Sequence, residues 1–83
     1  MTVLASLNEI FRVVFDDPEL VISPQTTAND VSGWDSLSHA NLISALELHF
    51  HISFSRKEIL TFRNVGEMVV TIEEKIGLSA KIP

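Results

Sequence analysis

The hydrophobic positions along the chain predict helices, and the first of them covers residues 3–15. Apolar side chains recur there at spacings of three and four residues, as on one face of an amphipathic helix. These residues are Val3, Leu4, Leu7, Ile10, Phe11, Val14 and Phe15. Asp16-Asp17-Pro18 is expected to end the helix, because proline disfavours helical geometry in the residue before it.

A second helix is predicted to begin at Asp35, whose side chain can cap the first turn. Its core stripe consists of Leu42, Ile43, Leu46 and Phe50. Residues 52–54 alternate between apolar and polar and indicate a short extended link. The sequence from Ser55 to Glu58 has capping-box spacing, so one or two helical turns should follow, to about Thr61.

Asn64 and Glu67 repeat the capping-box spacing and predict the start of the last helix. Gly77 stands where a helix C-terminus favours glycine. The predicted core face of this helix consists of Val65, Met68, Val69, Val70, Ile72 and Ile76. Together the patterns predict an all-α fold, a four-helix bundle with three longer helices and one short helix.

Residues 17–34 form a long connection between the first two helices, with two prolines and several turn signals. A connection of this length without a periodic element is uncommon in a compact domain and is often functional. It must pack, and the residues available for packing are Leu20, Val21, Ile22, Val31 and Trp34. We expect Trp34 to anchor the end of the loop on the bundle, with its N–H near a partner or water.

Composition narrows the class of protein. The 83 residues, 46% of them apolar, suffice for one small domain, and the absence of cysteine excludes disulfides and thiolate metal sites. The net charge of −5 argues against nucleic acid and anionic membranes as partners. No apolar run approaches the roughly 20 residues of a membrane span. The N-terminus also lacks the basic region of a secretory signal. We expect a soluble, cytoplasmic monomer.

Ser36 is the first candidate for chemistry, because it falls in the first turn of the second predicted helix. Backbone N–H groups there lack partners within the helix, so a phosphate ester on the hydroxyl would meet these donors and the positive end of the helix dipole. The alternative is that Asp35-Ser36 is simply a helix start, since both residue types are common caps.

The wider pattern resembles the acyl carrier protein family over about residues 3–76. The residues that carry the resemblance are Trp34-Asp35-Ser36-Leu37, then Leu42-Ile43, Ala45-Leu46-Glu47, Phe50, Ile52 and Asn64-Val65. In that family a phosphopantetheinyl transferase moves 4′-phosphopantetheine from coenzyme A to the serine. The resemblance therefore implies a single carrier domain over residues 1–83, with no catalysis of its own. It implies that Ser36 bears the arm, which holds acyl or aminoacyl thioesters, and that Asp35 and Leu37 help the transferase recognise the site.

The second predicted helix departs from carriers of fatty-acid synthesis, which usually present acidic residues to basic partner enzymes. A helical projection places an uncharged strip opposite its core stripe: Ser36, Leu37, Asn41, Ser44 and Leu48. We assign partner binding to Asn41, Ser44 and Leu48, together with Glu47, the one acid kept. The expected partners are an acyl-loading ligase or transferase and a downstream synthase or acyltransferase, in polyketide or other specialised biosynthesis. A fatty-acid or D-alanyl carrier with ordinary partners, or an unmodified helical interaction scaffold, are the alternatives.

Three histidines complete the candidates. His39 projects toward the core side of its helix, one turn beyond Ser36. It is either a polar group at the mouth of a cavity for the acyl chain, or a packed side chain with solvated nitrogens. A hydrolytic pair with Ser36 is a third option, but it lacks an orienting third residue. His49 and His51 should point to different faces, so we predict no metal site.

Overall fold

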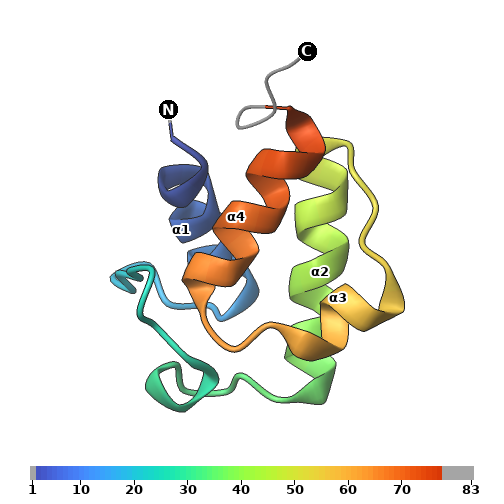
Figure 1. Cartoon of the computed structure of the whole chain (residues 1–83). Coiled ribbons are helices and arrows are strands. Elements are labelled where there is room, and N and C mark those ends of the chain that lie inside the picture. The colour runs from blue at the N-terminus through green and yellow to red at the C-terminus, as the bar shows by residue number, and fades with distance from the viewer. Residues whose placement is uncertain (1, 78–83) are drawn as a thin grey trace.

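The computed structural model describes residues 2–77 (Figure 1). It contains four α-helices in the predicted order. A short 3₁₀ turn, Ala28–Asp30, lies within the long connection. The described residues contain no strand, so the all-α prediction is confirmed. The helices are α1 (Val3–Val14), α2 (Ser36–Phe50), α3 (Arg56–Thr61) and α4 (Val65–Ile76).

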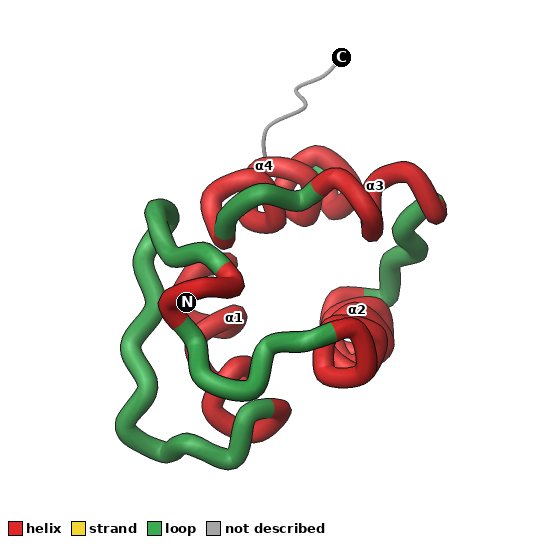
Figure 2. Tube along the Cα trace, turned by 90° about the horizontal axis from the view of Figure 1, so that it is seen from below, coloured by secondary structure: helices red, strands yellow, loops and turns green. Residues whose placement is uncertain are grey.

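The core is built from the apolar stripes of the three longer helices. α1 packs against both α2 and α4, and Figure 2 shows these three helices around one interior with α3 at the side of α4. The side chains with no exposed surface are Leu7, Phe11, Leu42, Leu46, Val65, Met68 and Ile72. Apolar burial of this kind supplies the main free energy of folding.

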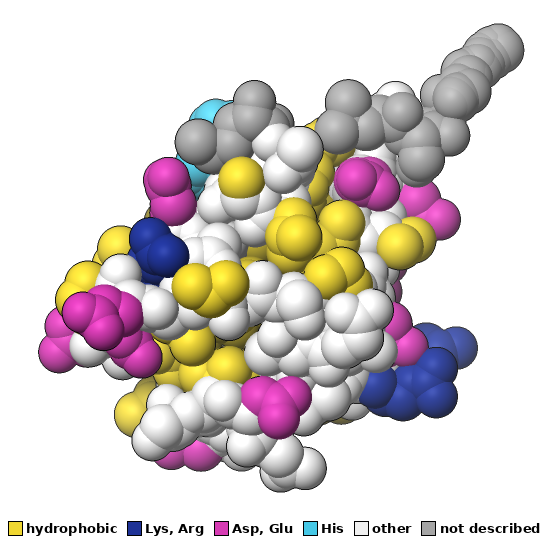
Figure 3. Space-filling view, turned by 90° about the vertical axis from the view of Figure 1, so that its left-hand side faces the viewer, with side chains coloured by type: hydrophobic (Ala, Val, Ile, Leu, Met, Phe, Trp, Pro, Cys, Tyr) yellow, Lys and Arg dark blue, Asp and Glu magenta, His cyan; other side chains and the backbone are white. Residues whose placement is uncertain are grey.

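Two valines that were predicted to pack inward do not. Val70 is 52% exposed, because it lies about 200° around α4 from both Met68 and Ile72. Val21 is 75% exposed, because alternate side chains of an extended segment point to opposite sides. Its neighbour Ile22 takes the buried position instead. Hydrophobic side chains are also visible on the face of the molecule that Figure 3 shows.

The helix ends follow the capping signals closely. Ser55 and Glu58 exchange hydrogen bonds in a capping box at the start of α3, as predicted. Gly77 ends α4 in the left-handed conformation, with φ at 84°. α1 also ends where expected, but the cause is the backbone of Asp16, whose φ is 52°. The N–H of Asp17 then bonds to the carbonyl of Arg12 at 2.9 Å, which closes the helix before Pro18 is reached.

The long connection is tied to two helices by hydrogen bonds. Asn8 of α1 donates to the carbonyl of Leu20 at 3.0 Å and accepts from the N–H of Ile22 at 2.7 Å. At the other side, the N–H of Gly66 in α4 donates to the carbonyl of Pro24 at 2.8 Å. A Cβ at position 66 would lie 3.0 Å from that oxygen, so glycine permits the approach. These bonds hold the loop in one course toward the start of α2.

Acid should destabilise this fold through three capping carboxylates, Asp35, Glu58 and Glu67. The pKa of each is held below its ordinary value, chiefly by one backbone N–H, that of Ser38, Ser55 or Arg63 respectively. A lowered pKa in the folded state contributes stability that is present above the unfolded-state pKa and is lost as the pH falls through the folded-state value. We expect the free energy of unfolding to decline as the pH drops from about 5 to 3.

Urea unfolding at a series of pH values measures this effect. The triple variant Asp35→Asn, Glu58→Gln, Glu67→Gln should show a flatter decline than the parent, because it lacks the three titrating caps. Glu9→Gln, at an exposed position on α1, is the control and should keep the parental slope. Equal slopes for the triple variant and the parent would contradict the prediction.

Candidate functional site

The first turn of α2 is held by reciprocal hydrogen bonds. Asp35 accepts from the N–H of Ser38 at 3.0 Å, and the Ser38 hydroxyl accepts from the N–H of Asp35 at 2.8 Å. The same hydroxyl donates to the carbonyl of Gly33 at 2.7 Å. Gly33 has a φ of 87°, a left-handed conformation that favours glycine. The predicted cap at Asp35 is thus confirmed, and Ser38, whose part was not predicted, completes it.

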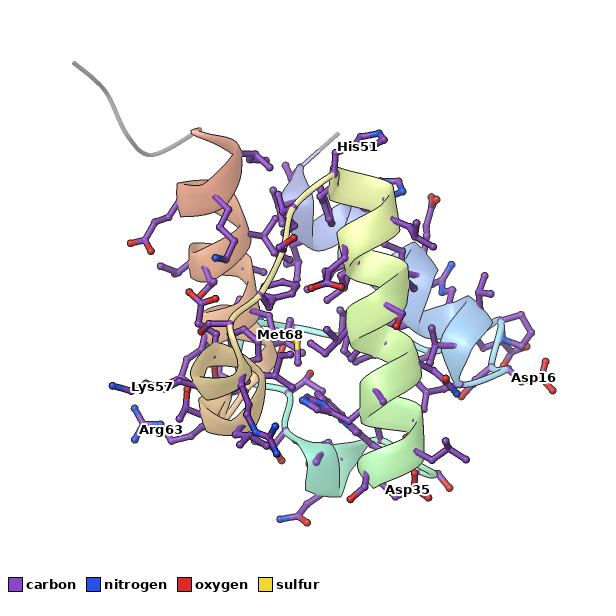
Figure 4. The ribbon with its side chains drawn as sticks, turned by 90° about the vertical axis from the view of Figure 1, so that its right-hand side faces the viewer. Asp16, Asp35, His51, Lys57, Arg63 and Met68 are labelled. Carbon is purple, nitrogen blue, oxygen red and sulfur yellow. The ribbon has the colours of Figure 1, made fainter. Side chains whose placement is uncertain are left out.

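This cap makes Ser36 the first residue of α2. Ser36 is exposed, and among the described residues its hydroxyl has no hydrogen-bond partner. The Asp35 carboxylate beside it is ionised at neutral pH, because the hydrogen bond from the Ser38 backbone N–H lowers its pKa. Leu37, the next residue, is 73% exposed. Figure 4 places Asp35 at the end of the α2 ribbon, where the chain enters from the loop.

A small depression adjoins Ser36. It has a volume of about 250 Å³ and lies between the end of the long loop, the start of α2 and the α3–α4 connection. The buried side chain of Met68 points into the bundle behind it (Figure 4). A larger groove of about 710 Å³ follows α3 and α4 and does not reach Ser36. The depression is lined by Ala28, Trp34, Asp35, Ser36, His39, Phe62, Arg63, Asn64 and Met68.

His39 connects three segments beneath Ser36. Its Nδ1 accepts from the Trp34 indole N–H at 3.0 Å, and an indole can only donate. The proton of the neutral ring therefore lies on Nε2, which donates to the Ile59 carbonyl of α3 at 2.9 Å. Trp34 also packs edge-on against Phe11 of α1, with ring centroids 5.3 Å apart. The anchoring role predicted for Trp34 is confirmed, and its N–H partner is His39.

The bonds of His39 decide between its three interpretations. Both ring nitrogens bond to protein atoms, so the prediction of solvated nitrogens is wrong. Neither nitrogen is free to take a proton from Ser36, which removes the basis for a hydrolytic pair. His39 does line the depression beside Ser36, as the cavity-mouth interpretation requires. For the other histidines, no group of three His, Asp or Glu side chains among residues 2–77 is arranged to hold a metal ion.

The outer face of α2 matches the helical projection. Asn41, Ser44 and Leu48 are all exposed, Leu48 at 78%. Glu47, which was assigned to partner binding as the one acid kept, lies outside the projected strip, and that assignment stays a prediction. Glu47 is half-buried, and its carboxylate accepts from the N–H of Phe54 at 2.9 Å. It thereby holds the link after the helix against α2.

Replacing His39 by leucine should cost about 1–3 kcal/mol of unfolding free energy, because the Trp34 N–H and the Ile59 carbonyl lose their partner in a half-buried position. Urea unfolding followed by the fluorescence of Trp34, the sole tryptophan, measures the cost. His49→Leu is the matched control on the exposed surface of the same helix and should change little. If the two variants lose the same stability, the His39 bridge does not contribute as described.

Comparisons with known proteins agree with this fold. Residues 2–79 match the family model described as "Phosphopantetheine attachment site". The whole chain is similar to the solution NMR structure of a holo acyl carrier protein from Geobacter metallireducens, at 41% identity and a TM-score of 0.86, and covers 98% of that chain. A stretch of 43 residues is 42% identical to an "Acyl carrier protein homolog" from Mycoplasmopsis pulmonis, spanning 52% of this chain and 59% of that relative. The chain belongs to the acyl carrier protein family, whose members use a 4′-phosphopantetheine group and act as carriers rather than catalysts.

Proposed function

We propose that this protein carries acyl or aminoacyl groups on a 4′-phosphopantetheine arm attached to Ser36. The observation that carries the proposal is the position of Ser36 as the exposed first residue of α2, beside a depression. This residue lies inside the segment that matches the attachment-site family. Asp35 and Leu37 flank it, and we assign them to recognition by the phosphopantetheinyl transferase.

The residues at the start of α2 fit a phosphodiester. An anion on the Ser36 oxygen would lie at the positive end of a 15-residue helix, a position that stabilises a surface charge by about 0.3–1 kcal/mol. The arm supplies the thiol that forms the thioester, and the protein itself contains no cysteine that could compete. What the chain contributes is a rigid, exposed attachment point, because the cap of Asp35 and Ser38 holds the first turn in place.

We also propose that the partners belong to polyketide or other specialised biosynthesis: an enzyme that loads the acyl group and a synthase or acyltransferase that receives it. The support is the outer face of α2, where Asn41, Ser44 and Leu48 carry no charge. Glu47 lies outside that strip, half-buried, with its carboxylate bonded to the N–H of Phe54. Recognition would rest on small apolar contacts, with Leu48 continuing into a groove of about 510 Å³ between α1 and α2.

The proposed setting is a monomer in the cytoplasm. Within residues 2–77, no helix has the length and apolar character needed to cross a membrane.

The attachment is tested by intact mass after incubation with coenzyme A, magnesium and a promiscuous phosphopantetheinyl transferase. The parent should gain one phosphopantetheinyl group, and Ser36→Ala should gain none. Ser44→Ala removes another exposed serine of the same helix and should gain the group like the parent. Folded parent protein that gains nothing would favour the unmodified scaffold instead.

The partner proposal predicts poor turnover of the loaded protein by ordinary fatty-acid synthase enzymes. The kcat/KM of these enzymes for the loaded parent protein should depend little on salt concentration, because the outer face of α2 has no charged residue to pair with a basic surface on the enzyme. The double variant Asn41→Asp, Leu48→Glu should raise kcat/KM about tenfold at low salt and make it salt-dependent. Steady-state kinetics at two ionic strengths measure both effects. Turnover of the parent as fast as that of the enzymes' own carrier would contradict the proposal and favour a fatty-acid carrier.

A further inference from the structure

Arg63 lines the same small depression as Ser36. It lies on the connection between α3 and α4, and among the described residues that line the depression it is the one Lys or Arg. In Figure 4, Arg63 and Asp35 are at the same end of the bundle, far from His51. Arg63 and the attachment point therefore line one depression of about 250 Å³, although the guanidinium itself is turned to Glu67.

The present partner of Arg63 holds it only at the surface. Its guanidinium contacts the Glu67 carboxylate at 2.9 Å, and the Arg63 side chain is 85% exposed. Exposed ion pairs are weak, so the guanidinium can exchange partners at little cost. Glu67 would keep a second bond in that event, since its other oxygen accepts from the Arg63 backbone N–H at 2.7 Å.

The charges near Ser36 favour such an exchange. Asp35 is ionised beside the attachment point, and the net charge of the chain is −5. A phosphodiester would add one more negative charge at this place. The N–H of Ser38 is already taken by Asp35, which reduces what the helix terminus can offer an anion. A guanidinium is the side-chain group best suited to the task, because its planar fork can bond two phosphate oxygens at once.

We propose that Arg63 leaves Glu67 and binds the phosphodiester once Ser36 carries its arm. Arg63 thereby fixes the root of the arm over the depression, so that the arm leaves the protein between α2 and the α3–α4 connection. This inference rests on the proposed function, because it needs a phosphodiester on Ser36. It assigns to Arg63 a contact with the prosthetic group, and it predicts a change at Glu67 that accompanies loading.

NMR of the apo and loaded proteins tests the exchange. In the parent, loading should raise the pKa of the Glu67 carboxyl group, since the guanidinium now helps to lower it. In Arg63→Gln, loading should leave that pKa unchanged, and the ³¹P resonance of the phosphodiester should shift from its parental position. Arg56→Gln is the matched control: it removes an exposed arginine of α3 that does not line the depression, and it should behave as the parent.

The outcomes separate this inference from the function on which it rests. Intact mass first establishes that the parent is loaded. If it is loaded, and neither the Glu67 titration nor the ³¹P resonance distinguishes Arg63→Gln from Arg56→Gln, the role of Arg63 is wrong while the carrier function stands. If folded parent protein gains no mass, the carrier function is wrong and the role of Arg63 falls with it.

Discussion

The reciprocal hydrogen bonds between Asp35 and Ser38 are the constraint on which the site depends. The 18 residues 17–34 connect the first two helices, and these bonds fix the point at which that connection ends and the first turn of α2 begins. Gly33 permits the bend, because glycine has no Cβ and can adopt the left-handed backbone conformation required there. Behind the turn, Trp34 is held between Phe11 and His39, so the end of the loop cannot move without breaking core contacts. Ser36, the proposed attachment point, is thereby held on a well-supported backbone.

Much of the fold could be predicted because its signals are local. Each helix carries an apolar stripe, and the caps at Asp35, Ser55 and Gly77 stand where the structure has them. Errors arose where a run of apolar residues was taken as one face. Val70 shows this cause, since helical periodicity puts it opposite Met68. The hydrogen bond of Glu47 could not be predicted either, because a projection of α2 alone does not include the N–H of Phe54 in the following link.

The candidate site divides in the same way. Ser36 and its flanks could be identified from the sequence, whereas the bridge from Trp34 through His39 to α3 could not, because it depends on where the Ile59 carbonyl lies after folding. Two different segments also supply the two kinds of side chain near the site. The exposed residues Asn41, Ser44 and Leu48 on the outer face of α2 are uncharged, while Arg63, the arginine that lines the depression beside Ser36, comes from the α3–α4 connection. In the proposals above, partner contact and arm contact are therefore assigned to different segments.

The central claim is that the rigid first residue of α2 is the attachment point. Peptide fragmentation of the loaded protein by mass spectrometry tests it most directly, because Ser38 lies two residues from Ser36 and Ser44 lies farther along the same helix. The account predicts a single phosphopantetheinyl group located on Ser36. A group located on Ser38, Ser44 or any other serine would contradict it, because the exposed first residue of α2 would then not bear the arm.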